Sequence, residues 1–291
     1  MKRVLILGAT GMLGSACLKV FDNDKSIEVL GTSRKSGDKL LLLDAKDDNV
    51  LVLLNEYHPN WIINCIGVIK PHINEASIDS IQNAIKINAQ FPADLALYAK
   101  ETSARIIQIA TDCVYSGKKG MYIESDLHDA TDVYGKTKSL GEIPFENIMH
   151  LRSSIIGPEL GKSTSLLEWF LTQPYNAQIN GFSDHLWNGI TTHQFAKISL
   201  GLIKSNYFSH GVQHIIPGDI VTKANLLNIF SKTYNRKDIK INETRSSNRV
   251  DRTLSTNQKN FNLNIWELAG YKTPPGIAEM VSEQAIFNQS L

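Results

Sequence analysis

The sequence predicts an α/β fold built on a doubly wound parallel sheet, followed by a smaller C-terminal α/β lobe. Three observations predict it. Short apolar runs alternate with longer helical stretches through the first half of the chain, the runs are continuous, and a glycine-rich turn follows the first of them. Continuous apolar runs are typical of parallel strands that are buried on both faces. We therefore expect an open parallel sheet as the framework of the molecule.

The first half of the chain contains the elements of this sheet. The apolar run at residues 4–7 is too short for the core of a signal peptide, so we expect it to form the first strand. Further strands are expected at residues 28–30, 61–64, 105–109 and 151–156. The intervening helices are expected at residues 14–21, 49–57, 78–100 and 134–143, and Pro144 should end or kink the last of them.

The alternation weakens after about residue 157. Helices are expected at 165–171, 192–204 and 223–233, strand pieces at 212–216 and 239–242, and closing helices at 257–263 and 276–290. We predict a dinucleotide-binding domain at residues 1–157 and a substrate lobe at 158–291, with a strand and a helix of the second part returning to the sheet. Sheets of this kind bind ligands outside the carboxyl ends of their strands.

The composition excludes several classes of protein. The 291 residues carry 30 Lys+Arg and 29 Asp+Glu, a net charge of +1, and 42% of them are hydrophobic. A disordered chain would be less apolar or more highly charged, and a nucleic acid or an anionic membrane would favour a basic chain. No apolar run approaches the roughly 18 residues of a membrane span. The three cysteines have no metal-ligand spacing, so we expect reduced thiols, no metal site and a cytoplasmic location.

The glycine-rich turn has the spacing G-x-x-G-x-x-G, formed by Gly8, Gly11 and Gly14. Gly8 permits a tight turn, Gly11 lets the backbone approach a pyrophosphate, and Gly14 lets the helix pack closely on the strand. Amides at the start of the following helix face the phosphates with the positive end of the helix dipole. The turn therefore predicts a Rossmann-type nucleotide site.

The residues after the second strand indicate which nicotinamide cofactor is bound. Enzymes that select NAD usually carry an acidic residue there, which holds the ribose 2′-hydroxyl. This chain has Ser33 and Arg34 instead, and an arginine pairs well with a 2′-phosphate. We therefore predict NADPH, with NADH as the alternative; Arg34 could also be an ordinary solvated loop charge.

Two Tyr-x-x-x-Lys pairs could carry acid–base chemistry, because an ammonium lowers the pKa of a nearby phenol. Tyr115 and Lys119 lie in a segment that we expect to be a loop. Tyr134 and Lys138 lie on a predicted helix that Asp132 can cap, where residues four apart share one face. The second pair is the predicted catalytic one. A third group, the Thr111 hydroxyl at the end of a strand, could polarise a carbonyl or simply hold a turn.

Taken together, these motifs resemble the extended short-chain dehydrogenase/reductases, and most closely the dTDP-4-dehydrorhamnose reductase group. The resemblance covers most of the chain. It rests on Gly8–Gly14, Leu43-Asp44, Asn64–Gly67, Asn88, Thr111–Gly117, Val133–Lys138, Gly141-Glu142, Leu151-Arg152, Gly189–Thr192, Phe195-Ala196 and Arg252–Thr256.

The resemblance implies roles for individual residues. Thr111, Tyr134 and Lys138 would form the catalytic triad, and Asn88 would brace the lysine. Asp44 would bind the adenine amine. The cofactor site as a whole would comprise Gly8, Thr10, Gly11, Met12, Leu13, Ser33, Arg34, Asp44, Ala45, Cys65, Ile66, Gly67, Tyr134 and Lys138. The substrate contacts would be Thr111, Asp112, Cys113, Trp187, Thr192 and Arg252.

Two departures from the family pattern keep the substrate open. Thr191 stands where the group has the proline of a Gly-x-Pro-Thr segment, and Trp187 precedes it, either as a stacking platform or as a core residue. A UDP-linked 4-keto deoxysugar, such as an N-acetylated one, is therefore an alternative to the dTDP-linked sugar. Cys113 lies where related epimerase-reductases carry an acid/base cysteine, but residues 157–171 lack the histidine those enzymes need, and His185 and His193 are expected to be surface or capping residues.

The resulting hypothesis is an NADPH-dependent reduction of the C4 ketone of a nucleotide-linked 4-keto-6-deoxyhexose. Hydride would come from the cofactor and the proton from Tyr134, with Lys138 lowering the pKa of the phenol and Thr111 orienting the carbonyl oxygen. The alternatives are a nucleotide-sugar epimerase, an epimerase-reductase, and a non-catalytic NADP-binding regulatory subunit on the same fold. A homodimer is common in this group.

Overall fold

The central sheet determines the architecture of the molecule. The computed structural model describes residues 1–159 and 164–289. Among these residues, seven parallel strands form one sheet in the order β11-β6-β5-β4-β1-β2-β3. Their bounds are β1 Lys2–Leu7, β2 Ile27–Ser33, β3 Leu40–Leu42, β4 Trp61–Asn64, β5 Arg105–Ala110, β6 Ile148–Arg152 and β11 Gly211–His214. The order reverses direction at β1 and β4, as in a Rossmann fold, which confirms the predicted fold class.

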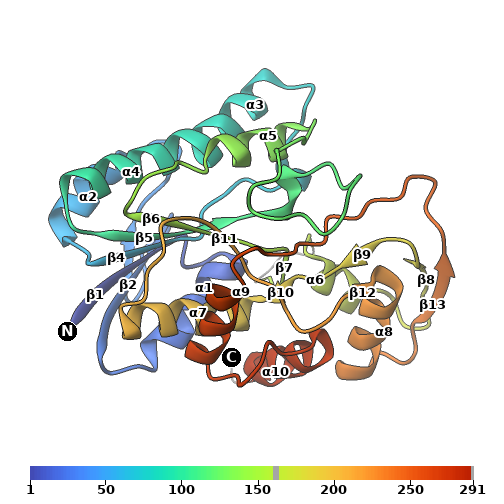
Figure 1. Cartoon of the computed structure of the whole chain (residues 1–291). Coiled ribbons are helices and arrows are strands. Elements are labelled where there is room, and N and C mark those ends of the chain that lie inside the picture. The colour runs from blue at the N-terminus through green and yellow to red at the C-terminus, as the bar shows by residue number, and fades with distance from the viewer. Residues whose placement is uncertain (160–163, 290–291) are drawn as a thin grey trace.

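Helices cover both faces of the sheet (Figure 1). One face carries α2 Val50–Tyr57, α3 Ile78–Ile85, α4 Phe91–Glu101 and α5 Val133–Leu140. The other carries α1 Met12–Asp22 and α7 Thr192–Ser205, with α9 Lys259–Leu268 and α10 Ile277–Gln289 packed against α7. Successive residues of a strand point to opposite faces. Val4 accordingly lies in the core beside α1, and Leu5 lies in the core beside α2 and α4.

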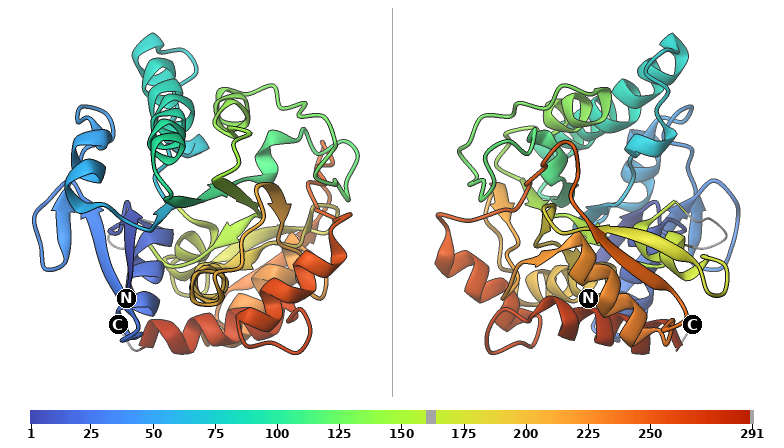
Figure 2. Two further views of the ribbon diagram at one scale, coloured as in Figure 1. Left: turned by 60° about the vertical axis from the view of Figure 1, so that its left-hand side comes forward. Right: turned by 90° about the vertical axis from the view of Figure 1, so that its right-hand side faces the viewer.

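A smaller lobe lies beyond the carboxyl edge of the sheet (Figures 1 and 2). It contains the helices α6 Leu166–Leu171 and α8 Lys223–Thr233. Its strands form two-stranded sheets that pair β8 Gln178–Phe182 with β13 Lys240–Thr244, β9 Leu186–Trp187 with β12 Val221–Thr222, and β7 Ile155–Ile156 with β10 Ile190–Thr191. The chain leaves the sheet after β6, returns with α7 and β11, and leaves it again. The division at residue 157 stays a prediction.

Several predicted elements needed correction. The strand expected at 151–156 is wrong as one strand, because β6 ends at Arg152 and the next pair of isoleucines turns away to pair with β10. The helix expected at 78–100 contains a π-helical turn, Lys86–Gln90, between α3 and α4. The helix expected to reach residue 143 ends at Leu140, before Pro144. Residue 290, the end of the last predicted helix, lies outside the described residues. Among the described residues, no helix is long and apolar enough to cross a membrane.

Candidate active site

The glycine-rich turn is fixed by contacts that only glycine allows at two positions. Gly8 has a φ of +78°, and a Cβ there would lie 2.8 Å from the Ile66 side chain. A Cβ on Gly14 would lie 2.2 Å from the carbonyl oxygen of Gly8. The turn is also joined to β2, since the Gly8 amide donates a hydrogen bond to Thr32 Oγ1 over 3.0 Å. The sequence therefore packs the start of α1 directly against the end of β1.

The start of α1 fits a bound phosphate. Gly11 is the N-cap, it is exposed, and no side chain caps the amides of the first turn. Thr10 is exposed as well, and its hydroxyl lies 3.3 Å from the hydroxyl of the buried Ser33. Arg34 follows as an exposed charge at the end of β2. Amides at the start of α1 and an exposed guanidinium at the same edge of the sheet are suitable donors for a dinucleotide with a 2′-phosphate.

The remaining predicted cofactor residues flank this turn. Met12 and Leu13 begin α1, and Cys65, Ile66 and Gly67 follow β4, which pairs with β1 through Leu7 and Asn64. Asp44 lies in the turn after β3, where one carboxylate oxygen accepts a hydrogen bond from the Lys46 amide, and Ala45 beside it is buried. Because these strands are parallel, their carboxyl ends meet at the edge where the glycine-rich turn lies.

Thr111 and Tyr134 meet at the end of β5. Asp132 caps α5 by accepting a hydrogen bond from the Gly135 amide over 2.8 Å, which confirms the predicted cap and places Tyr134 in the first turn. The Tyr134 side chain is half-buried. Burial raises the pKa of Tyr134 above its usual value, Cys113 raises it further, and a hydrogen bond with Thr111 lowers it. The phenol is therefore protonated, as a proton donor must be.

Lys138 is buried between α5 and β5. Its ammonium donates a hydrogen bond to the carbonyl oxygen of Ile109 over 2.9 Å, and only 7% of the residue is exposed. Burial lowers the pKa of Lys138 to about 8. Burial is the largest cause of the shift in the pKa of Tyr134, so the lowering expected from Lys138 does not dominate it.

Asn88 supports the active-site helix from the π-helical turn. Its side-chain amide bonds both the N–H and the C=O of Val68 over 2.9 Å and donates to Thr137 Oγ1 over 3.1 Å. Thr137 immediately precedes Lys138, so the contact is with the neighbour of the lysine rather than with the lysine itself. Asn88 thereby joins the loop after β4 to α5.

The other Tyr-x-x-x-Lys pair is structural. Tyr115 is fully buried, stacks on Tyr122 with ring centroids 4.1 Å apart, and accepts a hydrogen bond from Arg152 over 2.6 Å. Lys119 instead forms an ion pair with Asp126 at 2.5 Å. The two side chains therefore serve different contacts, as expected for residues in a loop.

Asp112, Cys113 and Arg252 gather beside the predicted triad. Burial raises the pKa of the Asp112 carboxyl, while Arg252 and Lys223 oppose that shift as nearby positive charges. Burial and the charge of Asp112 together raise the pKa of the Cys113 thiol to about 12. Arg252 is held in place because its Nε donates to the Tyr115 carbonyl oxygen over 2.8 Å. Sequence reasoning missed Lys223, whose one signal was a positive charge in the first turn of a helix, where the dipole disfavours it.

Two predicted substrate contacts are buried instead. Trp187 is 4% exposed, and its indole N–H donates to Ser154 Oγ over 2.8 Å. Thr192 is fully buried at the start of α7 and donates to Gln284 Oε1 over 2.9 Å. Both side chains are therefore packed inside the protein. For Trp187 the structure favours a core residue over a stacking platform. His185 and His193 are likewise engaged, by the Asn248 carbonyl and the Phe287 ring respectively.

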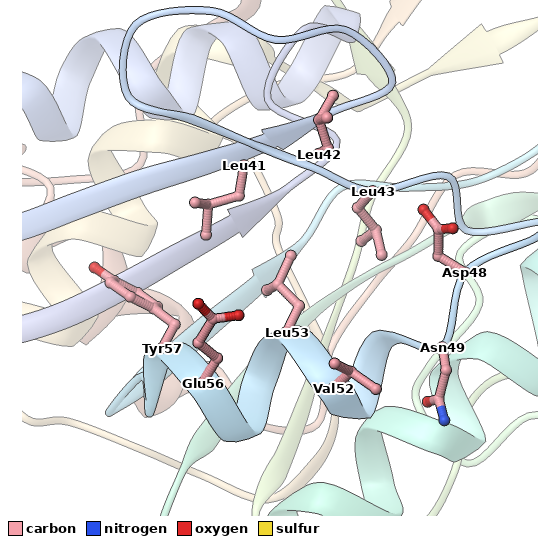
Figure 3. A pocket seen from close by; sticks show the side chains of 9 residues that line it. All are labelled: Leu41, Leu42, Leu43, Asp48, Asn49, Val52, Leu53, Glu56 and Tyr57. Atoms are coloured by element: carbon pink, nitrogen blue, oxygen red, sulfur yellow. The ribbon is translucent and has the colours of Figure 1, made fainter.

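A surface hollow of about 690 Å³ lies elsewhere, between the edge strand β3 and helix α2 (Figure 3). Its lining is mainly apolar and comprises Leu41, Leu42, Leu43, Asp48, Asn49, Val52, Leu53, Glu56 and Tyr57. None of the predicted catalytic residues lines it. Size alone therefore does not identify the site, and the convergence of Thr111, Tyr134 and Lys138 at the carboxyl edge is the better guide.

Comparison with known proteins places the chain in a family. Residues 1–156 match the family model described as RmlD substrate binding domain, which is more than half of the 291 residues. The chain belongs to the RmlD substrate binding domain family. The RmlD family match ends at Ile156, where β7 carries the chain into the smaller lobe.

Curated relatives match about half of the chain. The methionine adenosyltransferase 2 subunit beta of Rattus norvegicus is 33% identical over 144 residues, 48% of this chain and 42% of that protein. A dTDP-4-dehydrorhamnose reductase of Aggregatibacter actinomycetemcomitans is 31% identical over 143 residues, 49% of this chain and 46% of that protein. The match therefore spans less than half the length of these relatives.

Solved structures match almost the whole fold. A dTDP-4-dehydrorhamnose reductase of Clostridium acetobutylicum superposes with a TM-score of 0.76 at 23% identity, covering 99% of both chains. One of Bacillus anthracis, in complex with NADP, superposes with a TM-score of 0.77 at 18% identity, covering 99% of this chain and 100% of that one. At such identities the likeness establishes the fold of this RmlD family member.

Proposed function

We propose that this protein is an NADPH-dependent reductase of the C4 ketone of a nucleotide-linked 4-keto-6-deoxyhexose. The observation that carries the proposal is the convergence of Thr111, Tyr134 and Lys138 at the carboxyl edge of the sheet, beside the glycine-rich turn. Family membership and the dTDP-4-dehydrorhamnose reductase among the relatives support the same substrate class.

The cofactor would lie along the carboxyl edge. The amides at the start of α1 would hold its pyrophosphate, Ser33 and Arg34 its 2′-phosphate, and Cys65–Gly67 the other side of the dinucleotide. When bound, the nicotinamide supplies a hydride. Solved structures with the same fold are in complex with NADP or NAD, which supports a nicotinamide cofactor, and Ser33 and Arg34 are the reason for proposing NADPH.

The chain's own residues would supply the proton and the orientation. Tyr134 donates its phenolic proton to the oxygen of the ketone as that oxygen gains negative charge. Thr111 donates a hydrogen bond to the same oxygen and so fixes its position. Lys138, held by the Ile109 carbonyl, keeps a positive charge near the phenol and stabilises the phenolate that remains.

The second candidate is a non-catalytic regulatory subunit. The methionine adenosyltransferase 2 subunit beta of Rattus norvegicus is a 33% identical relative, and its name describes a subunit rather than a reductase. Against this candidate, a module that only binds NADP has no chemical use for a protonated Tyr134 beside Thr111 and a buried Lys138.

We also propose a location, a partner and an assembly for the protein. The three cysteines are free in the structure, which supports a reducing cytoplasm. The proposed small-molecule partner is the nucleotide sugar, and a homodimer is the proposed assembly.

The deciding experiment measures loss of NADPH absorbance with dTDP-, UDP- and GDP-linked 4-keto-6-deoxy sugars, with NADH in parallel. Turnover of one member supports the reductase and identifies its nucleotide. NADPH binding without turnover of any member favours the regulatory subunit. Tightly held NAD and interconversion of sugars without net oxidation would instead identify an epimerase.

A further inference from the structure

Lys223 occupies a position that local helix stability does not explain. It is the first residue of α8, after Thr222, whose hydroxyl caps the helix by accepting a hydrogen bond from the Asn225 amide over 3.1 Å. A positive charge in the first turn of a helix is unfavourable, because the helix dipole is positive there. The lysine must therefore have a counterpart outside α8.

The side chain of Lys223 is held against a buried tryptophan. The ammonium lies 5.5 Å from the centroid of the Trp187 ring, and that tryptophan is buried and fixed by Ser154. The lysine itself is partly buried. Within the described residues, 1–159 and 164–289, no protein atom accepts a hydrogen bond from its ammonium. All three of its donors are thus available to a ligand.

The surroundings of Lys223 belong to the predicted substrate site. Asp112 and Cys113, which follow Thr111, and Arg252 are its charged and titratable neighbours. Arg252 reaches this place from the segment after β13 and is anchored by the Tyr115 carbonyl. Lys223 and Arg252 both act on the Asp112 carboxylate beside Thr111, and Asp132, on which Arg252 also acts, is paired with Lys70. The surplus positive charge favours an anion at that place.

We propose that Lys223 is a substrate-positioning residue, whose ammonium donates hydrogen bonds to an anionic oxygen of the nucleotide sugar. That oxygen belongs to the diphosphate, because a 6-deoxyhexose carries no carboxylate of its own. The inference rests on the proposed function. It adds a residue of the smaller lobe, Lys223, to the proposed substrate site. Trp187 has a defined part in it: the indole face supports the lysine instead of stacking on the substrate.

The test is the affinity of the NADP-loaded protein for UDP, dTDP, UDP-glucose and UDP-glucuronate, measured by calorimetry. We expect Lys223→Gln to weaken binding about 10- to 100-fold, the loss that follows from removing a partly buried charged hydrogen bond. Lys232→Gln, an exposed lysine on the same helix, is the matched control and should bind each probe as the wild type does. NADP affinity and the unfolding midpoint should not change in either variant.

The outcomes separate the two proposals. A loss for every probe that the wild type binds assigns Lys223 to the diphosphate. A loss confined to UDP-glucuronate overturns the inference, because it would place Lys223 at a sugar carboxylate that a 6-deoxyhexose lacks. Wild-type affinity of Lys223→Gln for every probe overturns the inference and leaves the proposed function standing. An equal fall in NADP affinity also overturns it, because a structural role would produce that. Failure of the wild type to bind any probe overturns the inference, and the proposed function then depends on turnover of a GDP-linked sugar.

Discussion

The ammonium of Lys138 donates a hydrogen bond to the carbonyl oxygen of Ile109 over 2.9 Å. This contact joins the helix that carries Tyr134 to the strand that Thr111 directly follows. A buried lysine with a single backbone partner is costly, because its charge loses most of its hydration. The protein therefore maintains a destabilising charge at the place where the proposed reaction needs one.

Replacement of Tyr134 by phenylalanine removes the proton donor while keeping the ring. We expect turnover to fall by about 10²- to 10⁴-fold, the usual contribution of a general acid. NADPH affinity should stay within about twofold of the wild type, since the glycine-rich turn is untouched. The exposed Tyr175, replaced by phenylalanine, is the matched control. Near-normal turnover of Tyr134→Phe would contradict the assignment.

Replacement of Lys138 by methionine should have a pH-dependent effect on stability. The folded-state pKa of Lys138 is about 8, below the usual lysine value of 10.5. Between these values the unfolded chain binds more protons, so the free energy of unfolding of the wild type rises with pH. The stability of Lys138→Met relative to the wild type should therefore decline by about 2 kcal/mol between roughly pH 7.5 and pH 10. Urea titrations at the two pH values measure it; a constant difference would show that the ammonium is not buried.

Replacement of Arg152 by methionine should destabilise the fold strongly. Arg152 is fully buried and donates hydrogen bonds to Tyr115, His128 and His214 while pairing with the buried Glu142. Removing one partner of a buried ion pair leaves an uncompensated charge, which costs about 3–5 kcal/mol.

Urea unfolding measures that loss, and Glu142→Gln in the Arg152→Met background supplies the control. The second substitution removes the stranded carboxylate and should restore part of the lost free energy. A single-variant cost below about 1 kcal/mol would mean that the network contributes little.

Replacement of Arg34 by alanine tests the choice of cofactor. If Arg34 holds the 2′-phosphate, the Kd for NADPH should rise about tenfold or more, because a charged hydrogen bond to phosphate is lost. The Kd for NADH should not change, and the exposed Lys100→Ala should alter neither. An equal effect on both cofactors would assign Arg34 to the shared part of the dinucleotide.

The sequence by itself determined the framework. Buried parallel strands need continuous apolar runs, so β1, β4 and β5 could be located from hydrophobicity alone. The turn could be located as well, because a φ of +78° at Gly8 and the close approach at Gly14 exclude other residues. The choice of Tyr134 over Tyr115 followed from Asp132, a local signal that the structure confirms as a helix cap. These features depend on near neighbours in the chain.

Only the tertiary structure decided which distant side chains meet. Lys223 lies 112 positions after Thr111 in the sequence. Its charge nevertheless acts on Asp112, the residue that follows Thr111. Thr192 matched a substrate-binding segment in sequence and Trp187 preceded that segment, but packing against Gln284 and Ser154 buries the two side chains. Burial and long-range charge depend on how the lobe folds over the edge of the sheet. No pattern of neighbouring residues records that relationship, because it is set by contacts between segments far apart in sequence.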